Sequence, residues 1–398
     1  MKIALVSQEY PPETARGGIS SQTLTKAHGL AALGHQVYVI SRSITPERVV
    51  TNSGGVQVIR IPGMEKQLPV MTEQVQWLSH SLVVAAAIEA LDSAVHLDII
   101  DFPEWAAEGY VYLLNRTPWK TIPVVIQLHG PLVMLAHTIS WPDIKSSFYK
   151  VGFQMESTCI QLADAIYSSS ECSANWIRNY YKPANNNIPV IHMGIDTASF
   201  LNSEPKQNKH LTIAFAGKLV QNKGVEELVE SAISLSKEFN GLRLKLIGKG
   251  DEYFINNLKQ KAYNVGAMEL LDFVGFVDKE TLAIEFSKSH VFAAPSYYEG
   301  GPGFVYLEAM ACGLPVIACT GSGVEEIVED GVNGYLVPPK NVPSLTDALR
   351  KMLGDTARME AMGKRARAYV VREADTKYCI QKLEAFYYSV LQKSKAKV

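Results

Sequence analysis

Short runs of apolar residues alternate with segments of helical periodicity along nearly the whole chain. Continuous apolar runs of this kind are typical of strands in a parallel sheet whose two faces are covered by helices. A first helix is expected to begin at Ser20 or Ser21 and to stop before Gly34. In the first half of the chain we predict strands at residues 3–6, 37–40, 56–61, 98–102, 123–128, 165–168 and 189–192.

The alternation stops after residue 200 and restarts near residue 211. Residues 201–210 are polar and without periodicity, which indicates a linker between domain 1–200 and domain 211–374. Two doubly wound α/β domains in series place a crevice between the carboxyl ends of their sheets, where such folds bind ligands. In the second half we predict strands at residues 211–216, 242–247, 271–276, 291–294, 315–318 and 335–337.

Composition and charge exclude some classes of function but do not identify one. The 398 residues favour two domains, and the formal net charge of −2 gives no basic field for nucleic acid. The five cysteines show no CxxC spacing, which favours a reduced, cytoplasmic chain without a metal knuckle. The apolar stretch 82–91 contains Glu89 and is too short to cross a bilayer. Peripheral contact with the inner membrane surface is left open.

The most informative segment, residues 295–317, reads as a strand end, a glycine loop and a helix. Gly301 and Gly303 let backbone N–H groups approach a ligand closely, and the helix that starts near Phe304 aims its positive end at this loop. Such an end suits a phosphate. Glu308, inside the helix, can accept two ribose hydroxyls, while Glu299 ends the strand. A glycine turn with a capping glutamate is the structural alternative.

This segment resembles the signature of the family-four retaining glycosyltransferases, also called glycosyl transferases group 1. The resemblance implies a GT-B architecture, with two Rossmann-like domains facing across a crevice. It also implies that Glu299 contacts the donor sugar and Glu308 the ribose, with Pro302 in the loop between them. Eight residues separate the two glutamates here, one more than in the family pattern, and the extra residue falls within 300–303. The resemblance places the final helix, in 375–398, back on the first domain.

A second match is the strand and loop of residues 215–224, which resembles the family's Gly-Arg-Leu…Lys-Gly segment. Lys218 stands where the family usually has arginine, and Lys223 follows on the same loop. Two cations in this arrangement can neutralise a diphosphate, although a solvated surface charge is the alternative for either lysine alone. Gly248, after the next strand, and Phe276, in the segment whose backbone reads the base in the family, complete the predicted donor site.

The N-terminal half offers weaker candidates, each at the end of a predicted strand. Gly17 and Gly18 resemble the family's first glycine loop, and His129 resembles its crevice histidine. A plain strand–helix turn and a packed polar side chain are the alternatives. Glu104 and Trp105 are candidate acceptor contacts, because carbohydrate faces stack well on tryptophan.

The resemblance implies a retaining hexosyltransferase that acts in polysaccharide or glycoconjugate synthesis. No two aspartates have Asp-x-Asp spacing, so we predict no metal and no cofactor, with Lys218 and Lys223 supplying the positive charge. His129 and Glu299 are interpreted as orienting and electrostatic residues. UDP-glucose is the preferred donor, and a saccharide or lipid-linked saccharide is the acceptor. A nucleotide-sugar 2-epimerase and a catalytically silent sugar-nucleotide-binding subunit remain the alternatives.

Overall fold

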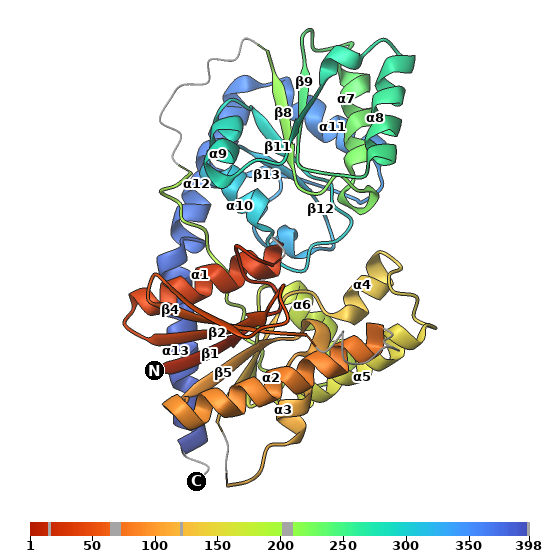
Figure 1. Cartoon of the computed structure of the whole chain (residues 1–398). Helices are drawn as coiled ribbons and strands as arrows, with labels where there is room; N and C mark the ends of the chain where they lie inside the picture. The colour runs from red at the N-terminus through yellow and green to blue at the C-terminus, as the bar shows by residue number, and fades with distance from the viewer. Residues whose placement is uncertain (15–16, 64–72, 120–121, 201–209, 396–398) are drawn as a thin grey trace. The chain divides into compact units, whose positions relative to one another are not determined.

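The computed structural model describes residues 1–14, 17–63, 73–119, 122–200 and 210–395, with only the backbone given for 73–75 and 395. It divides into two compact units (Figure 1). Unit 1 comprises Met1–Gly194 with Thr376–Val398, and unit 2 comprises Ile195–Asp375. The junction comes earlier than residue 200 because Ile195 donates its N–H to the Ala374 carbonyl and Phe200 packs into the core of unit 2. Of the expected linker 201–210, residues 201–209 lie outside the described residues.

Unit 1 is built on a sheet whose described strands are parallel except for one edge strand. Their order is β3-β4-β2-β1-β5-β6-β7, and β3 pairs antiparallel with β4. Apolar side chains on β1, β5 and β6 are completely buried, as continuous apolar runs require. The strands are β1 (Lys2–Val6), β2 (Gln36–Arg42), β3 (Val49–Ser53), β4 (Val56–Ile61), β5 (Ile99–Pro103), β6 (Val124–Leu128) and β7 (Ala165–Ser168).

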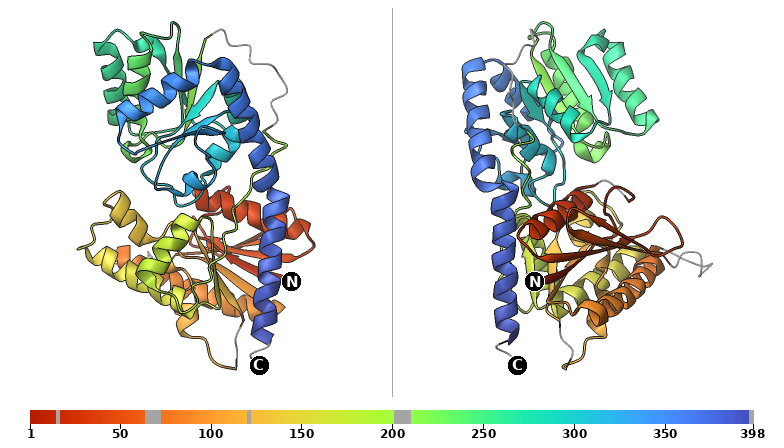
Figure 2. Two further views of the ribbon diagram at one scale, coloured as in Figure 1. Left: turned by 180° about the vertical axis from the view of Figure 1, so that it is seen from behind. Right: turned by 60° about the vertical axis from the view of Figure 1, so that its left-hand side comes forward.

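Helices cover both faces of this sheet. Helices α1 and α13 pack against each other on one face, and α2, α3 and α5 contact one another on the opposite face (Figure 2, right). Thus the last helix of the chain is part of unit 1. The helices are α1 (Gly18–Ala32), α2 (Glu73–Val95), α3 (Tyr110–Leu114), α4 (Leu132–Thr138), α5 (Ser147–Leu162), α6 (Glu171–Trp176) and α13 (Thr376–Lys395), with short turns η1 (Trp105–Ala107) and η2 (Ile177–Tyr181).

Unit 2 repeats the plan with a fully parallel sheet, of order β10-β9-β8-β11-β12-β13 in its described residues. Helices α7, α8 and α11 pack together on one face, and α9, α10 and α12 on the other. The strands are β8 (Thr212–Ala216), β9 (Arg243–Ile247), β10 (Leu271–Gly275), β11 (Val291–Ala293), β12 (Val316–Cys319) and β13 (Gly334–Val337). The helices are α7 (Val225–Leu235), α8 (Glu252–Asn264), α9 (Lys279–Ser287), α10 (Phe304–Ala311), α11 (Val342–Leu353) and α12 (Thr356–Glu373).

Two local predictions were wrong, and one strand was not predicted. Residues 189–192 form no strand, because only the isolated bridge between Ser168 and Val190 joins them to the sheet. Strand β3 was not predicted, since four of its five residues are exposed and carry no apolar run. Helix α1 is capped by Gly17, whose N–H donates to the Ser20 hydroxyl, so Ser20 lies inside the first turn.

Helix α2 extends well beyond the expected apolar stretch 82–91 on its N-terminal side. Its segment Gln76–Val95 meets the length and composition of a membrane span. The core helix of a water-soluble domain passes the same test, and here Val84, Ile88 and Leu91 are buried in the core of unit 1. Of the most apolar window in this segment, 33% is buried inside the protein.

Candidate donor and acceptor half-sites

In each unit the order of the strands across the sheet reverses direction at one point. Several of the predicted site residues lie in the loops that follow the two strands at this point. In unit 2 the reversal lies between β8, which leads to Lys218 and Lys223, and β11, which leads to Glu299. In unit 1 it lies between β1 and β5, and the latter leads to Glu104. Loops at the carboxyl ends of strands flanking such a point form the usual ligand site of open α/β sheets.

The loop after β8 brings Lys223 against the end of β11. Gly224 has a φ of +67°, and a Cβ there would collide with the Pro295 carbonyl oxygen. The Asn222 carbonyl accepts the N–H of Tyr297 at 2.9 Å, which joins the two loops. As a result Lys223 Nζ forms an ion pair with Glu299 Oε1, and both side chains remain partly exposed. Lys218, nearer the strand, is exposed.

The glycine loop before α10 is fixed by close backbone packing. Gly303 caps the helix with a φ of +69°, a conformation that favours glycine. The Glu299 carbonyl accepts the Gly323 N–H at 2.8 Å, and a Cβ on Gly323 would come within 2.7 Å of Gly301. Pro302 is buried, while Gly301 and Phe304 are partly exposed. The first N–H groups of α10 therefore end at a narrow, rigid loop suited to an anion.

Glu308 lies one turn further into α10 and is only 4% exposed. Burial raises the pKa of its carboxyl to about 7, and the charge of Lys279 at the start of α9 opposes this rise. A buried carboxylate needs hydrogen-bond donors, and the structure shows none from the described residues. A ligand with two adjacent hydroxyls would supply them.

Two further loops complete the carboxyl edge of this sheet. A Cβ on Gly248, after β9, would collide with the Gly217 carbonyl oxygen after β8, so the two backbones touch. Phe276 follows β10 and is 55% exposed, with Lys249 Nζ 5.8 Å from its ring centre. Gly248 donates its N–H to the Gly275 carbonyl at 2.8 Å, so this segment lies beside the loop after β9, and its base-binding role stays a prediction.

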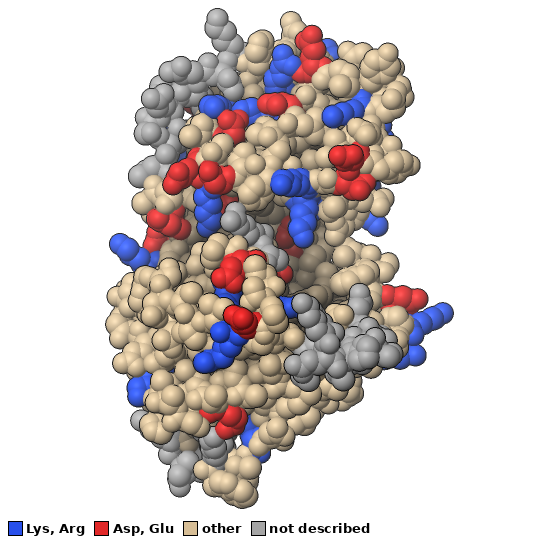
Figure 3. Space-filling model, in the orientation of Figure 1, with Lys and Arg blue, Asp and Glu red and all other residues tan. Residues whose placement is uncertain are grey.

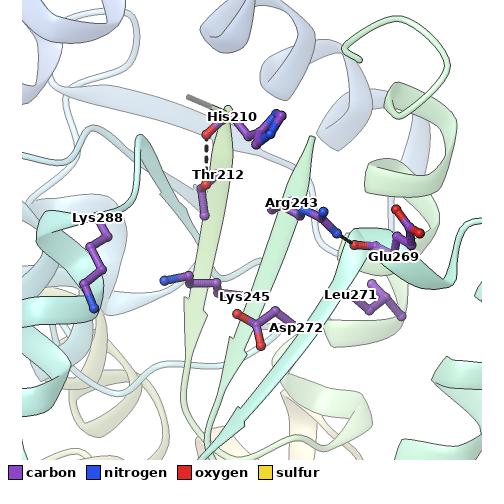
Figure 4. A pocket seen from close by; sticks show the side chains of 8 residues that line it. All are labelled: His210, Thr212, Arg243, Lys245, Glu269, Leu271, Asp272 and Lys288. Atoms are coloured by element: carbon purple, nitrogen blue, oxygen red, sulfur yellow. Dashed lines mark hydrogen bonds between the residues drawn. The ribbon is translucent and has the colours of Figure 1, made fainter. Parts of the chain in front are cut away.

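A broad depression of about 470 Å³ lies at the opposite edge of this sheet (Figure 4). It is lined at the amino ends of β8, β9 and β10 by residues such as Thr212, Arg243 and Asp272. The two lysines that line it, Lys245 and Lys288, already form ion pairs with Glu285. This depression is therefore a weaker candidate for the donor site than the carboxyl edge, where the glycine loops and the predicted lysines gather. Figure 3 shows charges of both signs interspersed on the visible surface of each unit.

In unit 1 two buried carboxylates hold the loop that carries His129. Glu104 Oε1 accepts the N–H groups of His129 at 2.7 Å and Gly130 at 2.5 Å. Glu156 Oε2 accepts the Leu132 N–H at 3.0 Å and the Tyr181 hydroxyl at 2.5 Å. Burial raises the pKa of both carboxyls, that of Glu104 to about 7. This geometry favours positioning of the loop by Glu104, and its predicted acceptor contact stays a prediction.

His129 itself is partly exposed at the end of β6. Burial, and then the charge of Lys26, lower its pKa to about 3, so the imidazole is neutral at physiological pH. Its Nδ1 is buried and has no partner among the described residues. Gly17 and Gly18 begin α1, and a Cβ on Gly17 would lie 3.1 Å from Glu9 Oε2, whereas Gly18 has open space beside it.

Sequence reasoning missed Glu156, Glu108 and His80. Glu108 is 2% exposed, and it accepts the Gln8 N–H and pairs with His80. These side chains come from separate segments and carry no local motif. Within the described residues, no group of three or more His, Cys, Asp or Glu side chains gathers as a metal site would require.

Two family models cover most of the chain. The model described as Glycosyltransferase Family 4 matches residues 16–199, and the model described as Glycosyl transferases group 1 matches residues 196–369. Among curated proteins, an uncharacterised glycosyltransferase of Methanocaldococcus jannaschii is 27% identical over 89% of this chain and 90% of its own length. The glycogen synthase of Mycobacterium tuberculosis is 25% identical over 94% of this chain and 91% of its own length.

Solved structures share the fold. A sucrose-phosphate synthase from Thermosynechococcus elongatus superimposes with a TM-score of 0.83 at 21% identity, over 98% of this chain and 99% of that one. HepE of Anabaena, solved with UDP-glucose, gives a TM-score of 0.75 at 19% identity, over 98% of this chain and all of that one. The two doubly wound units thus have the GT-B architecture, and the chain belongs to the group 1 glycosyltransferases.

Proposed function

We propose that this chain transfers a glucosyl group from UDP-glucose to a saccharide or lipid-linked saccharide, with retention of the anomeric configuration and without a metal ion. The observation that carries the proposal is the pairing of Lys223 with Glu299 beside the glycine loop of α10. Lys223, Glu299 and the first N–H groups of α10 lie on one edge of one sheet, where they would serve as a cation, a sugar-binding carboxylate and a phosphate-binding helix end.

The main requirement of the mechanism is stabilisation of the leaving group. A nucleotide diphosphate gains negative charge as the glycosidic bond breaks, and Lys218, Lys223 and the N–H groups of α10 would stabilise that charge. The acceptor oxygen then attacks the same face of the sugar while the departing phosphate takes its proton. His129, which is neutral at physiological pH, would orient hydroxyls by hydrogen bonds.

The donor is proposed from relatives and neighbours. HepE was solved with UDP-glucose, and one relative is a glycogen synthase. Another, from Mycobacterium tuberculosis, is named as a GDP-mannose-dependent mannosyltransferase and is 29% identical over 63% of this chain. GDP-mannose is therefore the competing donor that a test must include.

The test incubates the protein with UDP-glucose, UDP-galactose, UDP-GlcNAc or GDP-mannose, in EDTA and in Mg²⁺. We expect UDP-glucose to be hydrolysed slowly without acceptor, equally in both buffers, with α-glucose released first. Dependence on Mg²⁺ would refute metal independence, and release of β-glucose would refute retention. Formation of UDP-ManNAc would establish the epimerase alternative. Nucleotide binding without turnover of any donor would establish the silent subunit.

We also propose that the protein works in the cytoplasm, at the inner membrane surface when its acceptor is lipid-linked. The five cysteines show no CxxC spacing, and Cys159, Cys312 and Cys319 are buried, which suits a reducing compartment. Cell fractionation tests this location, and recovery only from an oxidising compartment would refute it.

A further inference from the structure

A small pocket lies at the carboxyl edge of the sheet in unit 1, and the donor motifs do not use it. Gln8 follows β1, Arg42 ends β2, and Ser79 and His80 lie in the first turns of α2. The pocket has a volume of about 80 Å³, enough for several water-sized groups. Its lining is mainly polar, and the indole of Trp77 forms one of its walls.

The buried carboxylate of Glu108 contacts two of the residues that line the pocket. Glu108 Oε1 accepts the Gln8 N–H at 3.0 Å, and Glu108 Oε2 lies 3.1 Å from His80 Nε2. Ser79, which is 4% exposed, donates its hydroxyl to the Gln76 carbonyl. These bonds connect β1, α2 and the turn after β5. The polar lining is therefore preorganised before any ligand arrives.

Trp77 also joins the pocket to an aromatic surface. Its ring contacts Trp105 edge-on at 5.5 Å and Phe148 at 5.2 Å between ring centres. Trp105 in turn stacks on Trp141, with 28° between the planes and 6.3 Å between the centres. Trp141 is 49% exposed although Phe148 and Trp105 both support it. Trp141 thus offers a partly exposed ring that is joined to the pocket wall through Trp105 and Trp77.

We propose that this pocket and the Trp105–Trp141 surface form an acceptor subsite for a glycan of at least two sugar units. The inference rests on the proposed function, which requires a hydroxyl-bearing acceptor. One unit would place its hydroxyls against the polar lining beside Trp77, and the next unit would stack its C–H face on Trp141. An inositol phosphate or a lipid headgroup would fill the polar pocket but leave the aromatic surface unused. A glycan uses both.

The test measures direct binding to the UDP-saturated protein by calorimetry, with maltotriose, cellotriose, chitotriose and α-1,6-mannotriose as probes and myo-inositol 1-phosphate as the non-glycan arm. We expect at least one trisaccharide to bind, and Trp141→Ala to weaken it about tenfold, as loss of an aromatic anchor does. His80→Gln, which keeps a donor for Glu108 but removes the ring from the wall, should act similarly. UDP-glucose affinity should stay unchanged in both variants.

Trp119→Ala is the matched control. Trp119 is 85% exposed and precedes β6, so it lies toward the amino edge of the same sheet. Its loss should leave trisaccharide affinity unchanged. The proposal is overturned if no trisaccharide binds, if Trp141→Ala binds normally, or if only the inositol phosphate binds. Failure to turn over any donor would instead refute the proposed function, because glycan binding is measured without turnover.

Discussion

Protonation of Glu308 is expected to control donor affinity within the physiological pH range. Burial raises the pKa of this carboxyl to about 7, whereas an ordinary glutamate is ionised from pH 5 upwards. Only the ionised carboxylate can accept both ribose hydroxyls, because the protonated form must place its own proton. The donor should therefore bind tightly above pH 7 and progressively more weakly below it.

The size of the effect follows from the titration. At pH 6 about one molecule in eleven has an ionised Glu308, and at pH 8 about ten in eleven do. If binding requires the ionised form, the Kd of the donor should rise about tenfold from pH 8 to pH 6, or about 1.4 kcal/mol. Lys279 lowers this pKa by its charge, so Lys279→Met should move the midpoint above 7.

The measurement is calorimetric titration with UDP-glucose between pH 5.5 and 8.5. UDP-glucose is preferred to UDP because its pyrophosphate is a diester, whereas a terminal phosphate titrates near pH 6 and would mimic the effect. Glu308→Gln is the control, since its amide keeps one acceptor oxygen and does not titrate. It should bind at pH 8 about as weakly as the native protein at pH 6, with a flat profile.

Two results would refute this reasoning. A native Kd that is constant across the range would mean that Glu308 does not meet the ribose. The same pH dependence in Glu308→Gln would assign the titration to another group. Either result, on protein shown to be folded, would also weaken the match between the α10 segment and the family signature.

Other residues give shorter tests. Lys223→Ala should reduce transfer by about 10²–10³-fold, as loss of one partner of a developing charge does, and Lys218→Ala should act similarly; normal turnover would make either lysine a surface charge. Glu299→Gln should leave UDP affinity nearly intact and reduce transfer, and a normal rate would overturn its assignment to the sugar. Because the folded-state pKa of Glu104 is raised from 4.5 to about 7, the stability it contributes is present below pH 4.5 and is lost as pH rises to 7, by about 3 kcal/mol. The free energy of unfolding in urea should therefore fall less between pH 5 and pH 8 in Glu104→Gln than in the native protein. An equal fall in both proteins would contradict the raised pKa of Glu104.

The fold was largely predictable because its strands are buried on both faces. A parallel strand that is buried on both faces is apolar at nearly every position, so runs such as the one that became β12 stand out in the sequence. A strand at the edge of a sheet need not be apolar along its whole length. Strand β3 reads Val-Val-Thr-Asn-Ser and is mostly exposed, and it is defined only by its pairing with β4.

Some residues of the candidate site are likewise indicated by local sequence motifs, and others only by the folded structure. Glycine loops and helix ends are local, so the segments around Gly303 and Lys223 could be singled out in the sequence by their resemblance to the family's motifs. Glu156 lies inside α5, yet it bonds the first N–H of α4 and the Tyr181 hydroxyl. Packing of helices on the sheet creates such contacts, and no periodicity in the sequence encodes them.

The ion pair between Lys223 and Glu299 suggests how the donor half-site passes from its free to its bound form. Each side chain now neutralises the other, and because both are partly exposed, water can solvate the two charges as they separate, so breaking the pair costs little free energy. A diphosphate carries more charge than one carboxylate and would replace Glu299 as the partner of Lys223. The released carboxylate would then accept hydroxyls from the sugar attached to that diphosphate. Because both side chains stand on loops braced by Gly224 and Gly323, this exchange needs side-chain rotation and no movement of the backbone.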